Sequence, residues 1–443
     1  MKKKQSYRII RLVTALLFWI VFGFAFIGIV PFSAKFMHCQ FGPAAASLIG
    51  AFSFGAVTVV LSTALLTLIF GRFYCAVFCP LGILQDVVIN IFARKKRNIP
   101  NLTVLRYIVC AVVYGLLFAG WNVGFWLLEP YTLSGRFLMM SSAAWLIVPL
   151  ILLLAAWKKR LFCVSLCPVG TVLGLLAKVG VYRLRLTEKC VKCSRCAAVC
   201  PTGCVDVQKG TLDNERCVRC MDCIAACPVD AITFKRMKKE SAFDLSRRKF
   251  LQKSGMIFAG GIAAGTLAGK AAGKLEKFFK TSKILPPGAG NVFRFDRKCS
   301  ACQLCAANCP SEIIVADLVS GKVSLDLNKG VCRSDCNLCS QLCPVGALKK
   351  LSPEQKKRTK IASAIFLPEN CIVFQSGEDC GLCSTVCPAG AITLRRSGAP
   401  KLNGSRCIGC GACMDICPGM SAKAFRMEGV EEQSEINLTI STK

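Results

Sequence analysis

Six runs of four cysteines, each closed by a Cys-Pro pair, constrain this chain more than any other feature of its sequence. The chain has 31 cysteines among 443 residues, and a secreted domain stabilised by disulfides would be much shorter. In the spacing C-x2-C-x2-C-x3-C-P, three thiolates on one tight loop bind three irons of a [4Fe–4S] cluster. Structural zinc favours two C-x2-C pairs separated by a spacer. The six runs therefore predict six [4Fe–4S] clusters.

The first two runs have the spacing of a two-cluster bacterial ferredoxin, which we place in residues 180–240. In such a ferredoxin the fourth cysteine of each run binds the other cluster. We therefore expect two crossed ligand sets, namely Cys190, Cys193, Cys196 and Cys227 for one cluster, and Cys217, Cys220, Cys223 and Cys200 for the other. The pattern predicts a small α+β ferredoxin-like domain.

Four further runs lie in residues 291–425 and predict a second α+β ferredoxin-like region with four clusters. Two of these runs keep the regular spacing, one has an extra residue in its first gap, and one has a long first gap. Their cysteines are Cys299, Cys302, Cys305 and Cys309; Cys332, Cys336, Cys339 and Cys343; Cys371, Cys380, Cys383 and Cys387; and Cys407, Cys410, Cys413 and Cys417. Neighbouring runs can pair, or the runs can nest as outer and inner pairs, and the spacing does not choose between these arrangements.

Four apolar segments precede the first run and predict a helical membrane domain in residues 1–179. They are Leu12–Val30, Leu48–Phe70, Tyr107–Leu128 and Leu138–Trp157. Each has about the 17–25 residues that cross a bilayer, and none contains a charge, which disfavours buried helices of a soluble protein. Basic residues are concentrated before the first segment and after the second and fourth, so we expect these parts in the cytoplasm.

The formal charge of +32 follows from the same topology, because the basic residues flank the apolar segments. Six clusters with thiolate ligands would lower it to about +20. Nucleic acid is therefore not an expected partner. With one histidine, a bis-histidine haem within the chain is excluded, and a histidine-rich zinc enzyme or a Ser-His-Asp hydrolase is disfavoured.

Two matching segments after the second and fourth apolar segments carry four of the other cysteines. GRFYCAVFCPLG (71–82) resembles KRLFCVSLCPVG (159–170), which suggests two copies of a helix pair. If symmetry relates the copies, the four thiols can converge; they belong to Cys75, Cys79, Cys163 and Cys167. They can then bind a further metal centre, cycle between thiols and disulfides, or form a docking surface, or they can simply pack at helix ends.

Electron transfer at a membrane that releases protons needs a proton acceptor near the membrane face. His38 lies in an outer loop beside Cys39 and titrates in the useful range. Glu129 and Arg136 lie in LEPYTLSGR (128–136), a second outer loop. These three residues are the candidate catalytic residues. Of the remaining cysteines, Cys110 is expected in the core, whereas Cys204 has no clear role.

Residues 241–290 predict a signal or anchor followed by a linker. Ser-Arg-Arg-Lys-Phe-Leu (246–251) precedes the Gly/Ala-rich run Gly255–Gly269 and is similar to a twin-arginine signal, whose machinery exports folded proteins with their cofactors. The alternatives are a fifth span, for which the run is short, and a helix that stays in the cytoplasm. We expect residues 291–425 outside the cytoplasm and residues 426–443 as a tail.

Together these features resemble the NapH and NapG families of ferredoxin-type proteins, here joined in one chain. Residues of about 5–238 are similar to NapH, through four apolar segments, two C-x3-C-P motifs and a cytoplasmic ferredoxin pattern. The membrane core is also similar to that of methylamine-utilisation and nitrous-oxide regulator proteins. Residues of about 244–425 are similar to NapG, through a twin-arginine leader and four cluster motifs. The fusion and the altered fourth and fifth runs depart from the family pattern.

The resemblance implies a quinol-dehydrogenase-like protein of the bacterial inner membrane, which oxidises menaquinol from the quinone pool and supplies electrons to a periplasmic reductase or a c-type cytochrome. Two alternatives stay open. A low-potential cytoplasmic donor can reduce the inner clusters, with quinone or the outer clusters as acceptor. The protein can also be a redox sensor or a maturation factor for an exported metalloenzyme. No GxGxxG motif is present, so direct reduction by NADH is not expected.

Overall fold

The computed structural model separates the chain into two units, the first mainly before Lys274 and the second mainly after Leu275. The residues whose structure is described are 2–27, 40–50, 54–92, 99–100, 102–118, 123–140, 144–236, 283–317, 320–419 and 422–436. The twin-arginine-like motif (246–251), the run Gly255–Gly269 and the candidate residue His38 lie outside these ranges.

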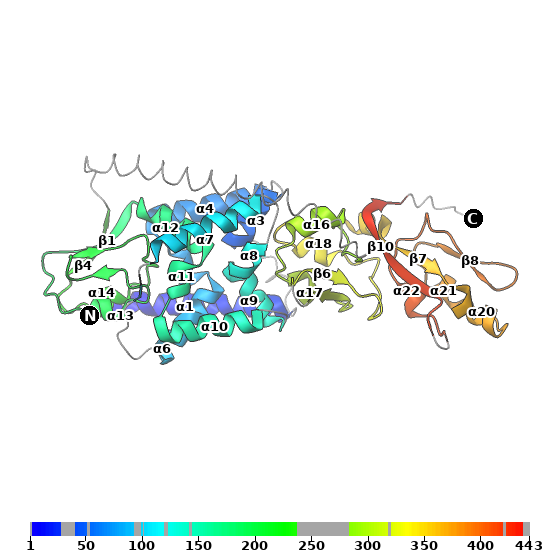
Figure 1. Ribbon diagram of the computed structural model, residues 1–443, viewed down its shortest axis with the longest axis horizontal. Coiled ribbons are helices and arrows are strands. Elements are labelled where there is room, and N and C mark those ends of the chain that lie inside the picture. Colours follow the sequence, from blue (N-terminus) through cyan, green and yellow to red (C-terminus); the bar gives the residue numbers. More distant parts are fainter. Residues whose placement is uncertain are drawn as a thin grey trace. The chain divides into compact units, whose positions relative to one another are not determined.

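The first unit begins with helices formed by the apolar segments and their flanks (Figure 1). Leucine and alanine, which favour helix, are abundant here, and three of the helices start at a proline, where the missing N–H breaks no helical hydrogen bond. The helices are α1 (Lys2–Ile27), α3 (Phe41–Gly50), α4 (Phe54–Phe70), α5 (Tyr74–Val77), α6 (Pro80–Phe92), α7 (Thr103–Phe118), α8 (Val123–Leu128), α9 (Pro130–Leu138), α10 (Ala144–Lys158), α11 (Leu161–Ser165) and α12 (Pro168–Lys178).

One helix of the described residues, α1, is long and apolar enough to cross a membrane, through the stretch Ile9–Phe26. The four predicted spans are therefore not confirmed. The other three correspond to shorter apolar helices, with α4 in the second, α7 and α8 in the third, and α10 in the fourth.

These helices also expose apolar side chains on their outer faces. Large apolar residues are exposed along α1, α4, α7 and α10, and Phe54, Leu146 and Val104 are 84%, 79% and 73% exposed. An apolar surface that extends over several helices is the kind that a membrane or a partner protein covers.

A small α+β domain follows the helices in the same unit. Strand β1 (Tyr182–Leu186) pairs antiparallel with β4 (Ile232–Arg236), and β2 (Val205–Asp206) pairs with β3 (Thr211–Leu212). Helices α13 (Arg195–Val199) and α14 (Asp222–Ala226) each follow a residue in the left-handed conformation, which turns the cysteine loop back onto itself. The two halves of this domain therefore repeat one fold, as the repeated cysteine run predicts.

The second unit contains two further modules of short helices and two-stranded sheets. Strand β5 (Ile314–Ala316) pairs with β6 (Val323–Leu325), and β8 (Ile392–Leu394) pairs with β9 (Pro400–Leu402). The remaining elements before the last strand are α16 (Val292–Lys298), α17 (Leu304–Ala307), α18 (Leu338–Leu342), α19 (Pro353–Arg358), β7 (Thr359–Phe366), the 3-10 helix η2 (Pro368–Asn370), α20 (Ile372–Gln375), α21 (Leu382–Thr385) and α22 (Ala412–Asp415).

The segment that we predicted to be a tail continues this fold. Strand β10 (Phe425–Glu435) pairs antiparallel with β7, with Phe425 opposite Phe366 and Glu435 opposite Thr359. The absence of cysteine after Cys417 suggested a tail, but the strand gains its stability from pairing with β7, which the cysteine spacing does not report. Residues 437–443 lie outside the described part of the chain.

Candidate iron–sulfur sites

The first ferredoxin ligand set surrounds one pocket. Its four cysteines line the pocket together with apolar side chains from both halves of the domain; they are Cys190, Cys193, Cys196 and Cys227. Cys196 lies on α13, and Cys227 directly follows α14, so the fourth cysteine comes from the second run. The structure brings together the crossed set that the spacing predicts.

The second set is assembled in the same crossed way and is more deeply buried. Cys200 and Cys217 lie close enough to Cys220 and Cys223 to interact with them electrostatically, so the four thiols are near one another. All four are buried, whereas in the first set Cys193 is exposed. The two sites of this domain therefore differ in access to solvent.

A fifth cysteine, Cys204, lies beside the second set. Its Sγ is 3.5 Å from Cys200 Sγ, and its backbone N–H donates to Cys200 Sγ over 3.4 Å. It also interacts with Cys217. The sequence alone offered no role for Cys204, because its position four residues after Cys200 does not show that the chain folds back onto that sulfur. A hydrogen bond to a ligand sulfur is one means of setting a cluster's potential.

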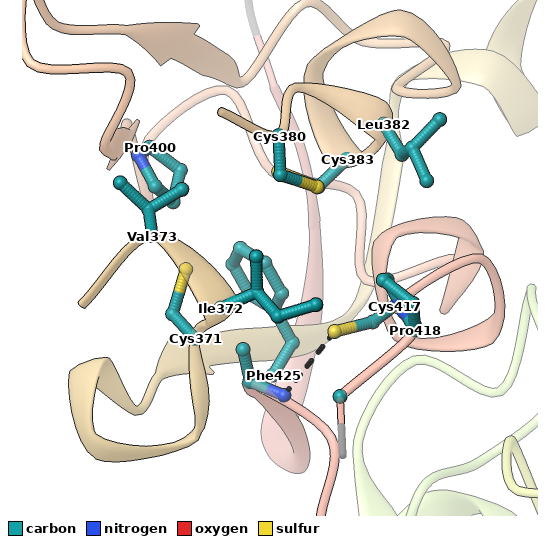
Figure 2. Close-up of a pocket in the computed structure, with 12 residues that line it drawn as sticks. Cys371, Ile372, Val373, Cys380, Leu382, Cys383, Pro400, Cys417, Pro418 and Phe425 are labelled. Carbon is teal, nitrogen blue, oxygen red and sulfur yellow. Dashed lines mark hydrogen bonds between the residues drawn. The ribbon is translucent and has the colours of Figure 1, made fainter. Parts of the chain in front are cut away.

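Figure 2 shows the corresponding pocket in the second unit, where four cysteines from two runs face a common space. They are Cys371, Cys380, Cys383 and Cys417. A neighbouring pocket is lined by Cys387, Cys407, Cys410 and Cys413. The fifth and sixth runs are therefore crossed with each other, and the long gap after Cys371 contains α20.

The third and fourth runs also combine with each other. Cys343 of the fourth run lies close enough to interact electrostatically with three cysteines of the third run, Cys299, Cys302 and Cys305. The charge of Cys309 acts in turn on Cys332 and Cys339 of the fourth run. Neighbouring runs thus pair, and the nested arrangement does not occur.

Backbone donors around these sites fit bound clusters. In five runs the sulfur of the Cys-Pro cysteine accepts a backbone N–H at 3.2–3.5 Å, at Cys200, Cys227, Cys343, Cys387 and Cys417. The bond to Cys417, from Ala424, is the dashed line in Figure 2. Such bonds stabilise a thiolate ligand.

Within the described residues, no group of three His, Cys, Asp or Glu side chains is close enough to hold a single metal ion. Thiolates around one tetrahedral zinc ion are about 4 Å apart. Ligands of a [4Fe–4S] cluster bind separate irons and stand farther apart. The feature that favours an iron–sulfur cluster over zinc is the C-x2-C-x2-C-x3-C-P spacing in the sequence.

The four cysteines of the C-x3-C-P motifs lie in one buried apolar core within the helical part of the first unit. They are Cys75, Cys79, Cys163 and Cys167. Cys79 and Cys167 immediately precede the prolines that begin α6 and α12. Burial raises the pKa of the thiols of Cys79 and Cys167 well above the usual value, and the other cysteines of the group raise it further.

The same core includes residues of the ferredoxin domain. Val218 and Cys220, a cysteine of the second ligand set, pack in the same core as the four C-x3-C-P cysteines. Lys159 Nζ donates to the carbonyls of Ala198 and Cys200, at 2.6 and 3.2 Å. These contacts hold the more buried ferredoxin site against the four-cysteine core.

Glu129 and Arg136 are buried, not placed in an exposed loop. Residues 130–138 form α9, Glu129 is its N-cap, and the two side chains are 1% and 0% exposed. The Thr132 N–H donates to Glu129 Oε2 over 2.6 Å, and the Arg136 guanidinium lies 4.6 Å from the Trp126 ring. The prediction of a loop was wrong because Pro130 starts a helix whose apolar face packs inward.

The surroundings of Glu129 link it to the four-cysteine core. The Glu129 carboxyl interacts electrostatically with the hydroxyls of Tyr74 and Tyr114. Tyr74 also interacts with Cys79, and Tyr114 with Cys167. Among the described residues, Glu129 forms no ion pair. Burial raises the pKa of its carboxyl to about 7.

Comparison with known protein families assigns iron–sulfur binding to both units. A 4Fe-4S binding domain matches residues 52–100, 137–187 and 339–359. A 4Fe-4S dicluster domain matches residues 189–231 and 376–422. The two dicluster segments, 189–231 and 376–422, contain cysteine runs that the structure brings together in pairs.

Several curated proteins are similar to this chain. Ferredoxin-type protein NapH of Escherichia coli is 32% identical over 167 residues, which are 36% of this chain and 55% of NapH. Methylamine utilization ferredoxin-type protein MauN of Methylobacillus flagellatus is 33% identical, over 30% of this chain and 48% of MauN. Ferredoxin-type protein NapF of Escherichia coli is 32% identical over 138 residues, which are 30% of this chain and 80% of NapF.

The chain spans about half the length of NapH and MauN. No solved structure matches it. NapF is covered over most of its length, and both iron–sulfur domains recur in the chain. The chain therefore belongs to the ferredoxin-type 4Fe–4S electron-transfer proteins.

Proposed function

We propose that this protein is a membrane-bound electron carrier that oxidises menaquinol and passes electrons, through six [4Fe–4S] clusters, to a periplasmic reductase or a c-type cytochrome. The observation that carries the proposal is the joining of a ferredoxin site to the helical core, through Val218 and Cys220. A bound [4Fe–4S] cluster supplies one-electron transfer. The 24 cysteines of the six runs would hold the clusters.

The arrangement in the membrane is part of the proposal. The exposed apolar faces of α1, α4, α7 and α10 support four spans, although α4, α7 and α10 have 17, 16 and 15 residues against a lower limit of about 17. The positive-inside rule then places the first ferredoxin domain in the cytoplasm. The twin-arginine-like motif supports export of the second unit to the periplasm, with 255–269 as its signal or anchor.

Glu129 is the best-supported proton acceptor for quinol. Oxidation of one quinol releases two electrons and two protons, and the protons need a base. Glu129 is buried, has no ion-pair partner among the described residues, and is close to Tyr74 and Tyr114. The other two candidate catalytic residues are less well supported, because His38 lies outside the described residues and Arg136 is buried against the Trp126 ring.

The test is anaerobic mixing of the full-length protein, purified in detergent with oxidised clusters, with menaquinol. Reduction followed by EPR and absorbance supports the proposal, and the number of reduced clusters shows how far electrons travel. If the clusters respond only to a much stronger reductant such as dithionite, quinol is not the donor.

A second function is favoured by one observation, the solvent exposure of Cys193 in the first ligand set. An exposed site suits a soluble partner, so a low-potential cytoplasmic donor can deliver electrons there, with quinone or the outer clusters as acceptor. A maturation factor would also use such electrons. Loss of cofactor from an exported reductase in a deletion strain would distinguish maturation from electron supply.

Menaquinol oxidation should increase as the pH rises through about 7, because the Glu129 carboxyl accepts a proton only when ionised, and its pKa is raised to about 7. In Glu129→Gln the step should disappear, and the rate above pH 7 should fall about 100-fold or more. The readout is the initial rate of cluster reduction between pH 5.5 and 8.5. Ser134→Ala, on the same helix, removes a hydroxyl bonded to the Pro130 carbonyl and should keep the step. A pH step that survives in Glu129→Gln would assign the base to another group.

A further inference from the structure

We propose that Cys75, Cys79, Cys163 and Cys167 together hold one additional [4Fe–4S] cluster, shared between the two sequence repeats. The 4Fe-4S binding domain matches both repeats, at 52–100 and 137–187. Each of these segments contains two cysteines, whereas a cysteine-bound [4Fe–4S] cluster takes four ligands. One repeat is therefore insufficient, and the structure buries all four cysteines in one core. The inference goes beyond the six clusters of the proposed function and holds for either electron donor.

The two repeats are locked together by a reciprocal pair of hydrogen bonds. Each motif carries an arginine three residues before its first cysteine. Arg72 Nη2 donates to the Cys163 carbonyl over 3.1 Å, and Arg160 Nη1 donates to the Cys75 carbonyl over 3.0 Å. The arginine of each repeat thus binds the first cysteine of the other repeat. This exchange holds the two cysteine pairs together in one buried core.

Two glycines show that the exchange is closely packed. A Cβ at Gly82 would lie 2.7 Å from the Cys75 carbonyl oxygen, and a Cβ at Gly170 would lie 2.8 Å from the Cys163 carbonyl oxygen. At Gly170 it would also lie 2.5 Å from Arg72 Nη2. Any side chain there would displace the arginine or the cysteine loop. The Gly170 N–H donates to Cys167 Sγ over 3.2 Å, the same type of bond that the ferredoxin cysteines receive.

The side chain of Arg72 gives independent evidence that the four-cysteine core holds a negatively charged group. Its side chain is fully buried, and no carboxylate among the described residues pairs with it. Its Nη1 reaches only the backbone carbonyl of Glu215, whose carboxylate pairs with Arg106 and Lys178. Its Nε has no hydrogen-bond partner, and Nη2 lies 3.9 Å from Cys75 Sγ.

A buried guanidinium without a counter-charge is costly. The buried Arg160 avoids this cost because it pairs with the carboxylate of Asp86, at 2.7 Å. For Arg72 the negative charge comes from the four cysteines, because four thiolates around an oxidised [4Fe–4S] cluster carry about −2. Simple packing of neutral thiols at helix ends leaves this charge uncompensated. The chemistry of the donor set therefore fits an iron–sulfur cluster, which would supply one-electron transfer beside Cys220.

The test compares iron and acid-labile sulfide per full-length chain, purified anaerobically in detergent, in Cys75→Ser, Cys163→Ser and the double variant. A shared cluster predicts that each single variant loses this cluster or converts it to a form with fewer irons, and that the double variant loses no more than about four irons and four sulfides in all. Cys110→Ser, a buried cysteine outside both motifs, is the matched control and should lose none. EPR of the reduced protein checks that the ferredoxin signals persist and that the variants are folded.

Unchanged iron content in the single variants would overturn the proposal, and additive losses would replace one shared cluster with two separate ones. If the variants aggregate, native mass spectrometry of the unmodified protein decides. Its mass should correspond to about 28 irons if the seventh cluster is present, and to about 24 if it is not. None of these readouts depends on menaquinol, so failure here and failure of quinol oxidation are distinguishable.

Discussion

Cys227→Ala is expected to abolish the same EPR signal as Cys190→Ala, although the two residues belong to different cysteine runs. The reason is that Cys227 lines one pocket with Cys190, Cys193 and Cys196. Removing one of four thiolate ligands should eliminate that cluster or convert it to a form with fewer irons. Cys217→Ala should abolish a different signal, because Cys217 faces Cys220, Cys223 and Cys200. The measurement is EPR of the dithionite-reduced protein with iron analysis.

The control for this experiment is Cys204→Ala. Cys204 contacts Cys200 but is not one of the crossed ligands, so both clusters should remain, and only the signal of the second should shift. Loss of different clusters in Cys190→Ala and Cys227→Ala would show that each run binds its own cluster. The test therefore separates crossed from uncrossed ligation without an activity assay.

The second large effect is expected for Asp86→Asn, which should destabilise the helical part of the first unit by about 3–5 kcal/mol. Asp86 Oδ2 lies 2.7 Å from Arg160 and 2.9 Å from Arg11, and Arg160 is fully buried. The asparagine keeps the shape but leaves the fully buried Arg160 without a carboxylate, and it leaves Arg11 with only Asp222, at 3.9 Å. Breaking a buried ion pair in this way costs more than the intact pair contributes.

Tryptophan fluorescence during denaturant unfolding measures this effect, since all five tryptophans precede Lys158 in the sequence. The matched control is Lys178→Gln, which removes the half-exposed partner of Glu215 and should cost less than about 1 kcal/mol. Equal stability of Asp86→Asn and the unmodified protein would mean that water or another group compensates the two arginines.

The same ion pair gives a direction for pH dependence. Burial by itself would raise the pKa of Asp86, but Arg160 and Arg11 outweigh it and hold the pKa below the ordinary value. A carboxyl whose pKa is lowered on folding stabilises the folded state above its unfolded pKa. This contribution is lost as the pH falls through the lowered pKa, so the helical part should weaken in acid.

The crossed ferredoxin sets could be predicted from the sequence because their geometry is local. In each run three cysteines lie within seven residues, and a tight loop of that length has few ways to present three thiolates to one cluster. The two regular runs 190–200 and 217–227 are close in the chain, and the next cysteine run begins only at Cys299. Each of the two runs therefore has the other as its nearest partner. The family match and the pockets agree with this local pattern.

Other features depended on contacts between distant segments. Pairing of the third run with the fourth, and of the fifth with the sixth, was open until the structure brought Cys343 to Cys299 and Cys417 to Cys371. The pairing of β10 with β7 crosses some sixty residues and leaves no periodic signal in the cysteines. Likewise, the sequence predicted that Glu129 and Arg136 lie in an exposed loop. The prediction was wrong because helices elsewhere in the chain bury both residues.

The sequence by itself determined the chemistry of this protein, since the type and spacing of the cysteines select iron–sulfur clusters whatever the surrounding fold. It also showed that two C-x3-C-P motifs repeat. Only the tertiary structure brought the motifs into one core, because Arg72 meets Cys163 across 91 residues and Arg160 meets Cys75 across 85. Ligand spacing is a property of a short loop, whereas the convergence of two loops and the isolation of a buried charge arise only when distant helices pack together.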